Sequence, residues 1–254
     1  MKFDMHCHTA EGSPDAVVPI VEVIDRLKSK GYHGMVVTDH NSYKGYNSLK
    51  DKIEDFVVIK GIEYDTMEGA HMLIILPSNV DNEIFTLRGM RLEDTIKIVH
   101  VLGGIIGPAH PFDYYKMGMG NNPLWIKQFE IYNQLDFIEA FNACGREIGN
   151  ILANKLADYL DKPKFGGSDS HRVRSIGKGY TIFKEEIKNA DDLIRVIKEG
   201  NSSTTEVGGN IDYNAMINKH KILFRIGAMC YSIVNTYLSK KYEKRNMQFQ
   251  EVLE

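Results

Sequence analysis

Two histidines near the start of the chain stand two residues apart within the segment FDMHCH. Side chains alternate along a β-strand, so a strand here would turn His6 and His8 to the same face. Asp4 shares that face one step earlier, whereas Met5 and Cys7 point the other way. Two converging imidazoles can bind a transition-metal ion, although two ordinary histidines fit the pair equally well.

Six of the nine histidines, together with two carboxylates, lie at the ends or starts of predicted strands. In an α/β barrel the carboxyl ends of the strands form one face, where residues far apart in sequence converge. Buried imidazoles and carboxylates need partners, so a metal centre explains this set better than packing does. His33, His100 and His220 fall outside the pattern and are interpreted as ordinary side chains. The set comprises His6, His8, His40, Glu63, His71, His110, Asp169 and His171.

Apolar runs with strand and helix periodicity alternate along the chain. Strands are predicted within residues 3–8, 34–38, 56–63, 71–76, 105–111, 136–142, 164–171 and 180–183. Helices are predicted at 18–30, 45–52, 92–101, 146–160 and 191–198. A strand followed by a helix, repeated about seven times, predicts a mainly parallel α/β sheet. His71 opens its strand, which favours an antiparallel hairpin with the strand that carries Glu63.

The bulk properties restrict the class of protein. A chain of 254 residues with 43% hydrophobic residues can form one large domain, or one domain with a tail. A net charge of −3 offers no general electrostatic attraction for nucleic acid. The sequence shows no signal peptide and no run of about 18 apolar residues, so we expect no membrane span. The scattered Cys7, Cys144 and Cys230 are expected to be reduced thiols of a cytoplasmic protein.

The ordered motifs H-C-H, T-D-H, G-I-E, A-H, A-H-P and S-D-S-H resemble the polymerase and histidinol phosphatase (PHP) domain family. The resemblance covers roughly residues 1–207, and residues 208–254 would form a helical extension. It implies a distorted (β/α)7 barrel with two or three divalent metal ions at the carboxyl ends of the strands. A mixture of imidazole and carboxylate ligands suits zinc, manganese or iron.

The resemblance also implies a role for each matching residue. His6, His8 and Asp169 would hold the first ion, and Glu63 would bridge two ions. The remaining ligands would be His71 and His110 for the second ion, and His40, His171 and Asp15 for the third, with Glu11 as the alternative to Asp15. Glu63, Asp169 and His171 are the predicted catalytic residues, and Asp39 is expected to orient a ligand.

The family implies a metal-dependent phosphoesterase. Clustered cations lower the pKa of a bridging water, giving a hydroxide nucleophile, and they neutralise phosphoryl oxygens. The expected partner is a small phosphorylated substrate. The alternatives are a histidinol-phosphate phosphatase, a nuclease acting on nucleotides or short oligonucleotides, and a non-catalytic PHP interaction module. The module is disfavoured because all the core ligand positions are filled.

Substrate-binding residues are harder to identify. Arg172 and Arg174 directly follow His171, and a guanidinium matches phosphate oxygens bidentately, although a solvated loop explains them equally well. Arg146 is a further candidate. The glycine-bearing, aromatic segment 113–125 is either a lid or a surface excursion.

The tail contains a predicted basic amphipathic helix at about residues 221–238. We expect its apolar stripe to pack on the barrel or on a second copy of the chain, giving a homodimer, and we expect no stable membrane association. The stripe consists of Ile222, Leu223, Ile226, Met229, Cys230, Ile233, Val234 and Leu238.

Overall fold

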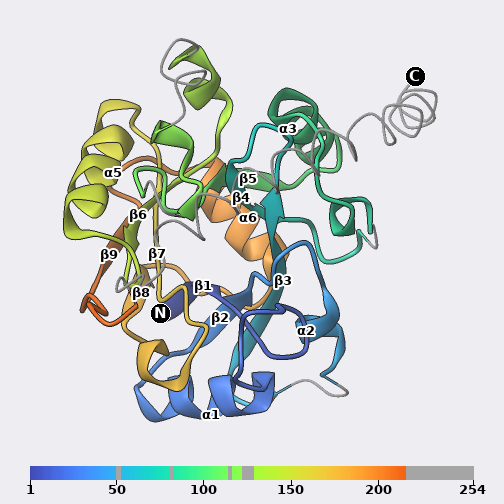
Figure 1. Ribbon diagram of the computed structural model, residues 1–254, viewed down its shortest axis with the longest axis vertical. Helices are drawn as coiled ribbons and strands as arrows, with labels where there is room; N and C mark the ends of the chain where they lie inside the picture. The colour runs from blue at the N-terminus through green and yellow to red at the C-terminus, as the bar shows by residue number, and fades with distance from the viewer. Residues whose placement is uncertain (50–52, 81–82, 114–115, 122–128, 216–254) are drawn as a thin grey trace, which may run out of the picture.

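The computed structural model describes residues 1–49, 53–80, 83–113, 116–121 and 129–215, and these residues form two sheets with helices around them (Figure 1). The larger sheet has seven strands in the order β5-β4-β3-β2-β1-β8-β9, and the smaller pairs β6 with β7. The strands are β1 (Lys2–Cys7), β2 (Gly34–Val37), β3 (Val57–Asp65), β4 (His71–Ile75), β5 (Ile105–Pro108), β6 (Ile138–Asn142), β7 (Lys164–Gly167), β8 (Gly179–Phe183) and β9 (Thr205–Gly209).

The strand directions are mixed. β1, β2 and β3 run parallel, as do β6 and β7, whereas β4, β8 and β9 pair antiparallel with their neighbours. The predicted hairpin of β3 and β4 is confirmed, with Asp65 opposite His71. Its connection, 66–70, is too short for the crossover that a parallel pair requires. The expectation of a mainly parallel sheet holds for β1, β2, β3, β6 and β7 but not for β4, β8 and β9, because helical periodicity between strands does not fix the direction of the next strand.

The small sheet lies between β5, at one end of the large sheet, and β1, and closes the barrel in part. On one side Asp169, just after β7, donates its N–H to the carbonyl of His6, and Cys7 bridges to Ser170. On the other side Asp136, just before β6, donates to the carbonyl of Ile106 on β5. The α/β class and the distorted barrel are thus confirmed, with nine strands among the described residues and incomplete closure.

Amphipathic helices cover the strands because their apolar residues repeat at helical spacing. In the first of them Ile20, Val23, Ile24 and Leu27 are buried. Asn189 caps the last by accepting the N–H of Asp192, as predicted. The helices are α1 (Ile20–Ser29), α2 (Lys44–Asn47), α3 (Leu92–Val101), α5 (Glu147–Tyr159) and α6 (Ala190–Lys198), with 3₁₀ turns at Ile84–Thr86, Met119–Asn121, Phe129–Gln134 and Val173–Ser175.

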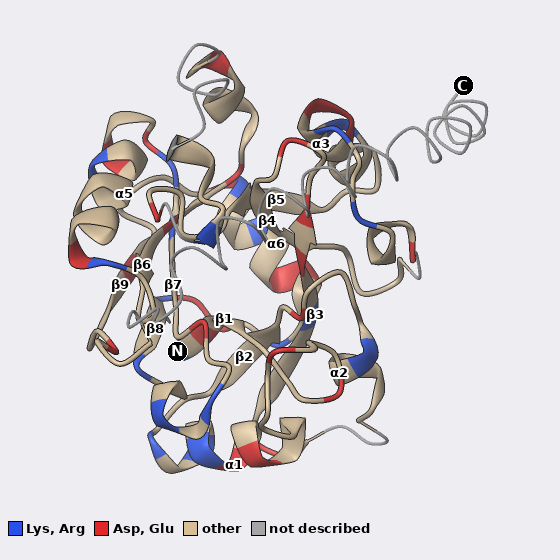
Figure 2. Cartoon of the chain, in the orientation of Figure 1, with Lys and Arg blue, Asp and Glu red and all other residues tan. Residues whose placement is uncertain are grey.

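Charges of both signs are interspersed on the outer helices, as α1 illustrates in Figure 2. Among the described residues, no helix combines the length and hydropathy that a membrane crossing needs. The predicted tail helix at 221–238, with its proposed docking or dimer contact, lies outside the described residues, as do residues 114–115 and 122–125 of segment 113–125.

Candidate metal centre

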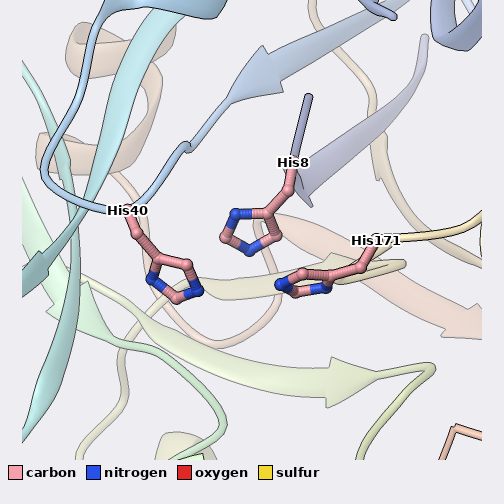
Figure 3. A group of neighbouring side chains, drawn as sticks. All are labelled: His8, His40 and His171. Carbon is pink, nitrogen blue, oxygen red and sulfur yellow. The ribbon is translucent and has the colours of Figure 1, made fainter. Parts of the chain in front are cut away.

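The six predicted imidazoles converge at one end of the barrel. His6 and His8 lie at the end of β1, and their Nε2 atoms are 3.1 Å apart. His40 follows β2 and His171 follows β7, and Figure 3 shows both rings turned toward His8, with ring centroids 4.5 and 4.1 Å from that of His8. His110 follows β5. The sixth, His71, opens β4 and reaches the same rim because β4 runs antiparallel to β3.

Glu63 on β3 lies in the middle of these rings and is fully buried. Its Oε1 is 2.9 Å from His71 Nδ1 and 3.0 Å from His110 Nε2. Its Oε2 is 3.1 Å from His40 Nδ1, 3.2 Å from His8 Nε2 and 3.4 Å from His6 Nε2. The one carboxylate therefore faces five imidazoles, two with Oε1 and three with Oε2.

Asp169, after β7, supplies a second buried carboxylate. Its Oδ1 faces the histidines, at 3.3 Å from His8 Nε2 and 3.5 Å from His171 Nδ1. Its Oδ2 accepts hydrogen bonds from the ammonium of Lys116 and from Asn142 Nδ2. The two oxygens of Asp169 thus have different neighbours.

Of the two acidic candidates in the loop after β1, Asp15 lies beside the cluster. Its Oδ2 is 3.2 Å from His171 Nε2 and 3.7 Å from His40 Nε2. Glu11 instead accepts the backbone N–H of Ile20 with both oxygens and so satisfies a free donor at the start of α1.

The chemistry of this donor set fits metal ions. Glu63 Oε2 is buried without a hydrogen-bond partner among the described residues, although three imidazole nitrogens lie within 3.4 Å. Groups of three ligand atoms within 4.8 Å of one another recur around it, for example His6 with His8 and Glu63, and His8 with His40 and His171. Imidazole and carboxylate together suit zinc, manganese or iron.

Other side chains contact the ring nitrogens that face away from the centre. Glu139 on β6 lies 2.9 Å from His6 Nδ1 and accepts the backbone N–H of His110. Ser13 lies 2.9 Å from His8 Nδ1 and donates to Asp39. Such partners fix ring orientation and leave the other nitrogen facing the centre. The expectation that Asp39 orients a ligand agrees with this arrangement.

Two of the strand-end residues have a strained backbone conformation. His110 and Asp169 have φ values of 31° and 49°, in a region that side chains other than glycine rarely adopt. Each such residue costs about 1–3 kcal/mol, which the surrounding contacts must offset. Strain of this kind concentrates at functional sites.

Electrostatics keep the buried carboxylates of Glu63 and Asp169 charged. Burial alone would raise the pKa of Glu63, but the imidazoles of His71, His40 and His6 outweigh it and lower the pKa well below its usual value. Burial lowers the pKa of His71, and the carboxylates of Glu63 and Asp65 reverse that effect and raise it to about 9.

The structure separates the predicted substrate arginines. Arg172 is exposed next to His171. Arg174 donates to the buried Asp212 at 3.3 Å, and the guanidinium of Arg146 donates to the carbonyl of Phe112. These contacts orient the last two guanidinium groups toward other parts of the protein.

Sequence reasoning missed three residues of the cluster. Asp65 follows Glu63 by two residues, so the alternation applied to His6 and His8 would have found it. Ser13 and Lys116 come from loops, where no spacing rule predicts contact.

Comparison with known proteins agrees with this arrangement. The PHP domain model matches residues 4–144, and the PHP-associated model matches residues 147–202. A protein of Methanocaldococcus jannaschii without an assigned function is 28% identical over an alignment of 178 positions that covers 65% of this chain and 96% of that protein.

Two solved structures share the fold at low identity. A lesion-specific endonuclease from Pyrococcus furiosus has a TM-score of 0.57 at 17% identity, over 81% of this chain and 57% of that chain. A protein provisionally described as a metal-dependent phosphoesterase, from Bifidobacterium adolescentis, has a TM-score of 0.50 at 16% identity, over 78% and 96%. Because the PHP domain model matches more than half of the sequence, the chain belongs to the PHP domain family.

Proposed function

We propose that the protein is a metal-dependent phosphoesterase that hydrolyses a phosphate ester at a centre of two or three divalent ions. The observation that carries the proposal is Glu63 Oε2, a buried charged oxygen that faces three imidazoles and has no hydrogen-bond partner in the described part of the chain. Leaving a buried acceptor unsatisfied costs about 1–3 kcal/mol or more, which a bound cation would offset.

The proposed ligands form three sets, one for each ion. Glu63 is shared between the first two ions, which explains why its two oxygens face different histidines. Asp15 serves the third ion in preference to Glu11, which is engaged at α1. The full proposed set is His6, His8 and Asp169 for the first ion, His71 and His110 for the second, and His40, His171 and Asp15 for the third.

The ions, zinc, manganese or iron, would neutralise phosphoryl oxygens and lower the pKa of an attacking water. The chain's own residues position the reactants. Glu63 and Asp169 stay ionised through their imidazole and ammonium neighbours, and we propose direct roles in the reaction for both. His171 is the third proposed catalytic residue, because it is partly exposed at the rim, where a substrate can reach it.

Arg172 is the strongest candidate for the phosphate contact, since it is exposed directly beside His171. Arg174 and Arg146 are weaker candidates because each already contacts another part of the chain. A nuclease acting on nucleotides or short oligonucleotides is the second candidate function, supported by the fold shared with the endonuclease.

A substrate panel tests the proposal. Metal-supplemented protein is assayed on phosphate monoesters, including histidinol phosphate, on phosphodiesters and on short oligonucleotides. Glu63→Gln should lower the rate by more than tenfold, a loss of more than about 1.4 kcal/mol of barrier stabilisation, because an amide offers one neutral acceptor. Glu147→Gln, an exposed change on α5, is the control. A Glu63→Gln rate above a tenth of wild type would show that Glu63 is not the shared ligand.

Loss of the arginines should separate substrate binding from metal binding. We expect Arg172→Ala to raise KM about tenfold at unchanged metal affinity, through loss of a charge-assisted phosphate contact. Arg174→Ala should leave KM unchanged, since its guanidinium pairs with Asp212. Steady-state kinetics measure both. Unchanged KM in Arg172→Ala and in the double variant would assign Arg172 to the solvated surface.

Metal binding should weaken as the pH falls. The pKa of His71 is raised to about 9 in the metal-free protein, so below that pH an ion must displace its proton. Affinity at this position should therefore rise with pH and level off near 9, with a slope of about tenfold per pH unit for one released proton. Calorimetric titration of wild type, His71→Gln and the exposed control His33→Gln checks this. A slope between pH 7 and 9 in His71→Gln as steep as that of wild type would assign the proton to another group.

A further inference from the structure

Asp65 is a second buried carboxylate on β3, two residues after Glu63 and 4% exposed. Asn41 holds it from two sides: Asn41 Nδ2 donates to Asp65 Oδ2 at 2.6 Å, and Asp65 N donates to Asn41 Oδ1 at 2.9 Å. Asn41 itself has a positive φ of 48°. The carboxylate is therefore fixed, with Oδ1 as its free oxygen.

Asp65 Oδ1 is buried and has no hydrogen-bond partner among the described residues. It nevertheless lies 3.2 Å from His71 Nε2. The two atoms are close but are not aligned for a hydrogen bond, and an isolated buried carboxylate oxygen is unfavourable. The short distance therefore points to a shared partner for both atoms.

The other nitrogen of the same ring shows which atom carries the hydrogen. His71 Nδ1 makes a hydrogen bond of 2.9 Å with Glu63 Oε1. A carboxylate oxygen without a proton only accepts, so Nδ1 is the donor in this bond to Glu63. A neutral His71 then has its lone pair on Nε2, facing Asp65 Oδ1. His40 completes the group, since one ligand atom from each of His40, Asp65 and His71 lies within 4.8 Å of the others.

We propose that Asp65 is a metal ligand, and that it forms with His40 and His71 a binding position for a divalent transition-metal ion beside Glu63. The inference rests on the proposed metal centre and revises it: His71 and His40 serve the Asp65 ion in place of the second and third ions, and His71 binds through Nε2 while donating to Glu63 through Nδ1. Two imidazoles and one carboxylate suit zinc or manganese. The cation would satisfy the free oxygen of Asp65.

Calorimetric titration with Mn²⁺ and Zn²⁺ tests the proposal on the full-length protein. Asp65→Asn should weaken one class of binding sites by about tenfold or more and leave the other ions in place. Asp113→Asn is the matched control, because Asp113 is equally buried but contacts Arg146. Binding by Asp65→Asn that equals wild type would overturn the assignment. Wild-type protein that binds no ion at all would instead refute the proposed metal centre.

A measurement on the wild-type protein remains informative if Asp65→Asn does not fold. Crystals grown with Mn²⁺ or Zn²⁺ should show an anomalous-scattering peak about 2.0–2.2 Å from Asp65 Oδ1 and bonded to His71 Nε2. Peaks at Glu63 with none bonded to Asp65 would overturn the inference. They would also leave the proposed function standing, so the two failures are distinguishable.

Discussion

A charged carboxylate that is fully buried, as Glu63 is, needs positive or hydrogen-bonding partners on every side. Glu63 finds them in imidazoles from β1, β4 and the segments after β2 and β5, and the barrel must bring these ends together. The incomplete barrel achieves this through the hydrogen bond from Asp169 to His6 and the one from Asp136 to Ile106. The partial closure of the barrel and the assembly of the centre therefore depend on the same contacts.

The cost of the arrangement is visible around the centre. His110 and Asp169 adopt positive φ values, and several buried oxygens lack hydrogen bonds within the described chain. Glu139, Ser13 and Asn41 hold the ligand side chains from behind, which reduces the conformational freedom that a bound ion would otherwise have to remove. Preorganisation of this kind is typical of metal sites, where residues behind the ligands tune orientation and basicity.

Much of the site was predictable because the carboxyl ends of barrel strands meet at one face and because side chains alternate along a strand. Alternation along a strand placed His6 and His8 together, and the start of β4 at His71 revealed an antiparallel hairpin. The mixed strand directions and incomplete closure were not predictable, since they depend on how distant segments pair. The contacts of Lys116 with Asp169 and of Arg174 with Asp212 were missed for the same reason. Asp65 was within reach of the alternation rule but was not considered.

We infer that the converging imidazoles and carboxylates hold metal ions. Elemental analysis of protein purified without chelator measures this most directly, with Glu63→Gln as the comparison. We predict at least two divalent transition-metal ions per chain in the wild-type protein, and fewer in the variant. A stoichiometry below one ion per chain after supplementation with zinc, manganese and iron would contradict it.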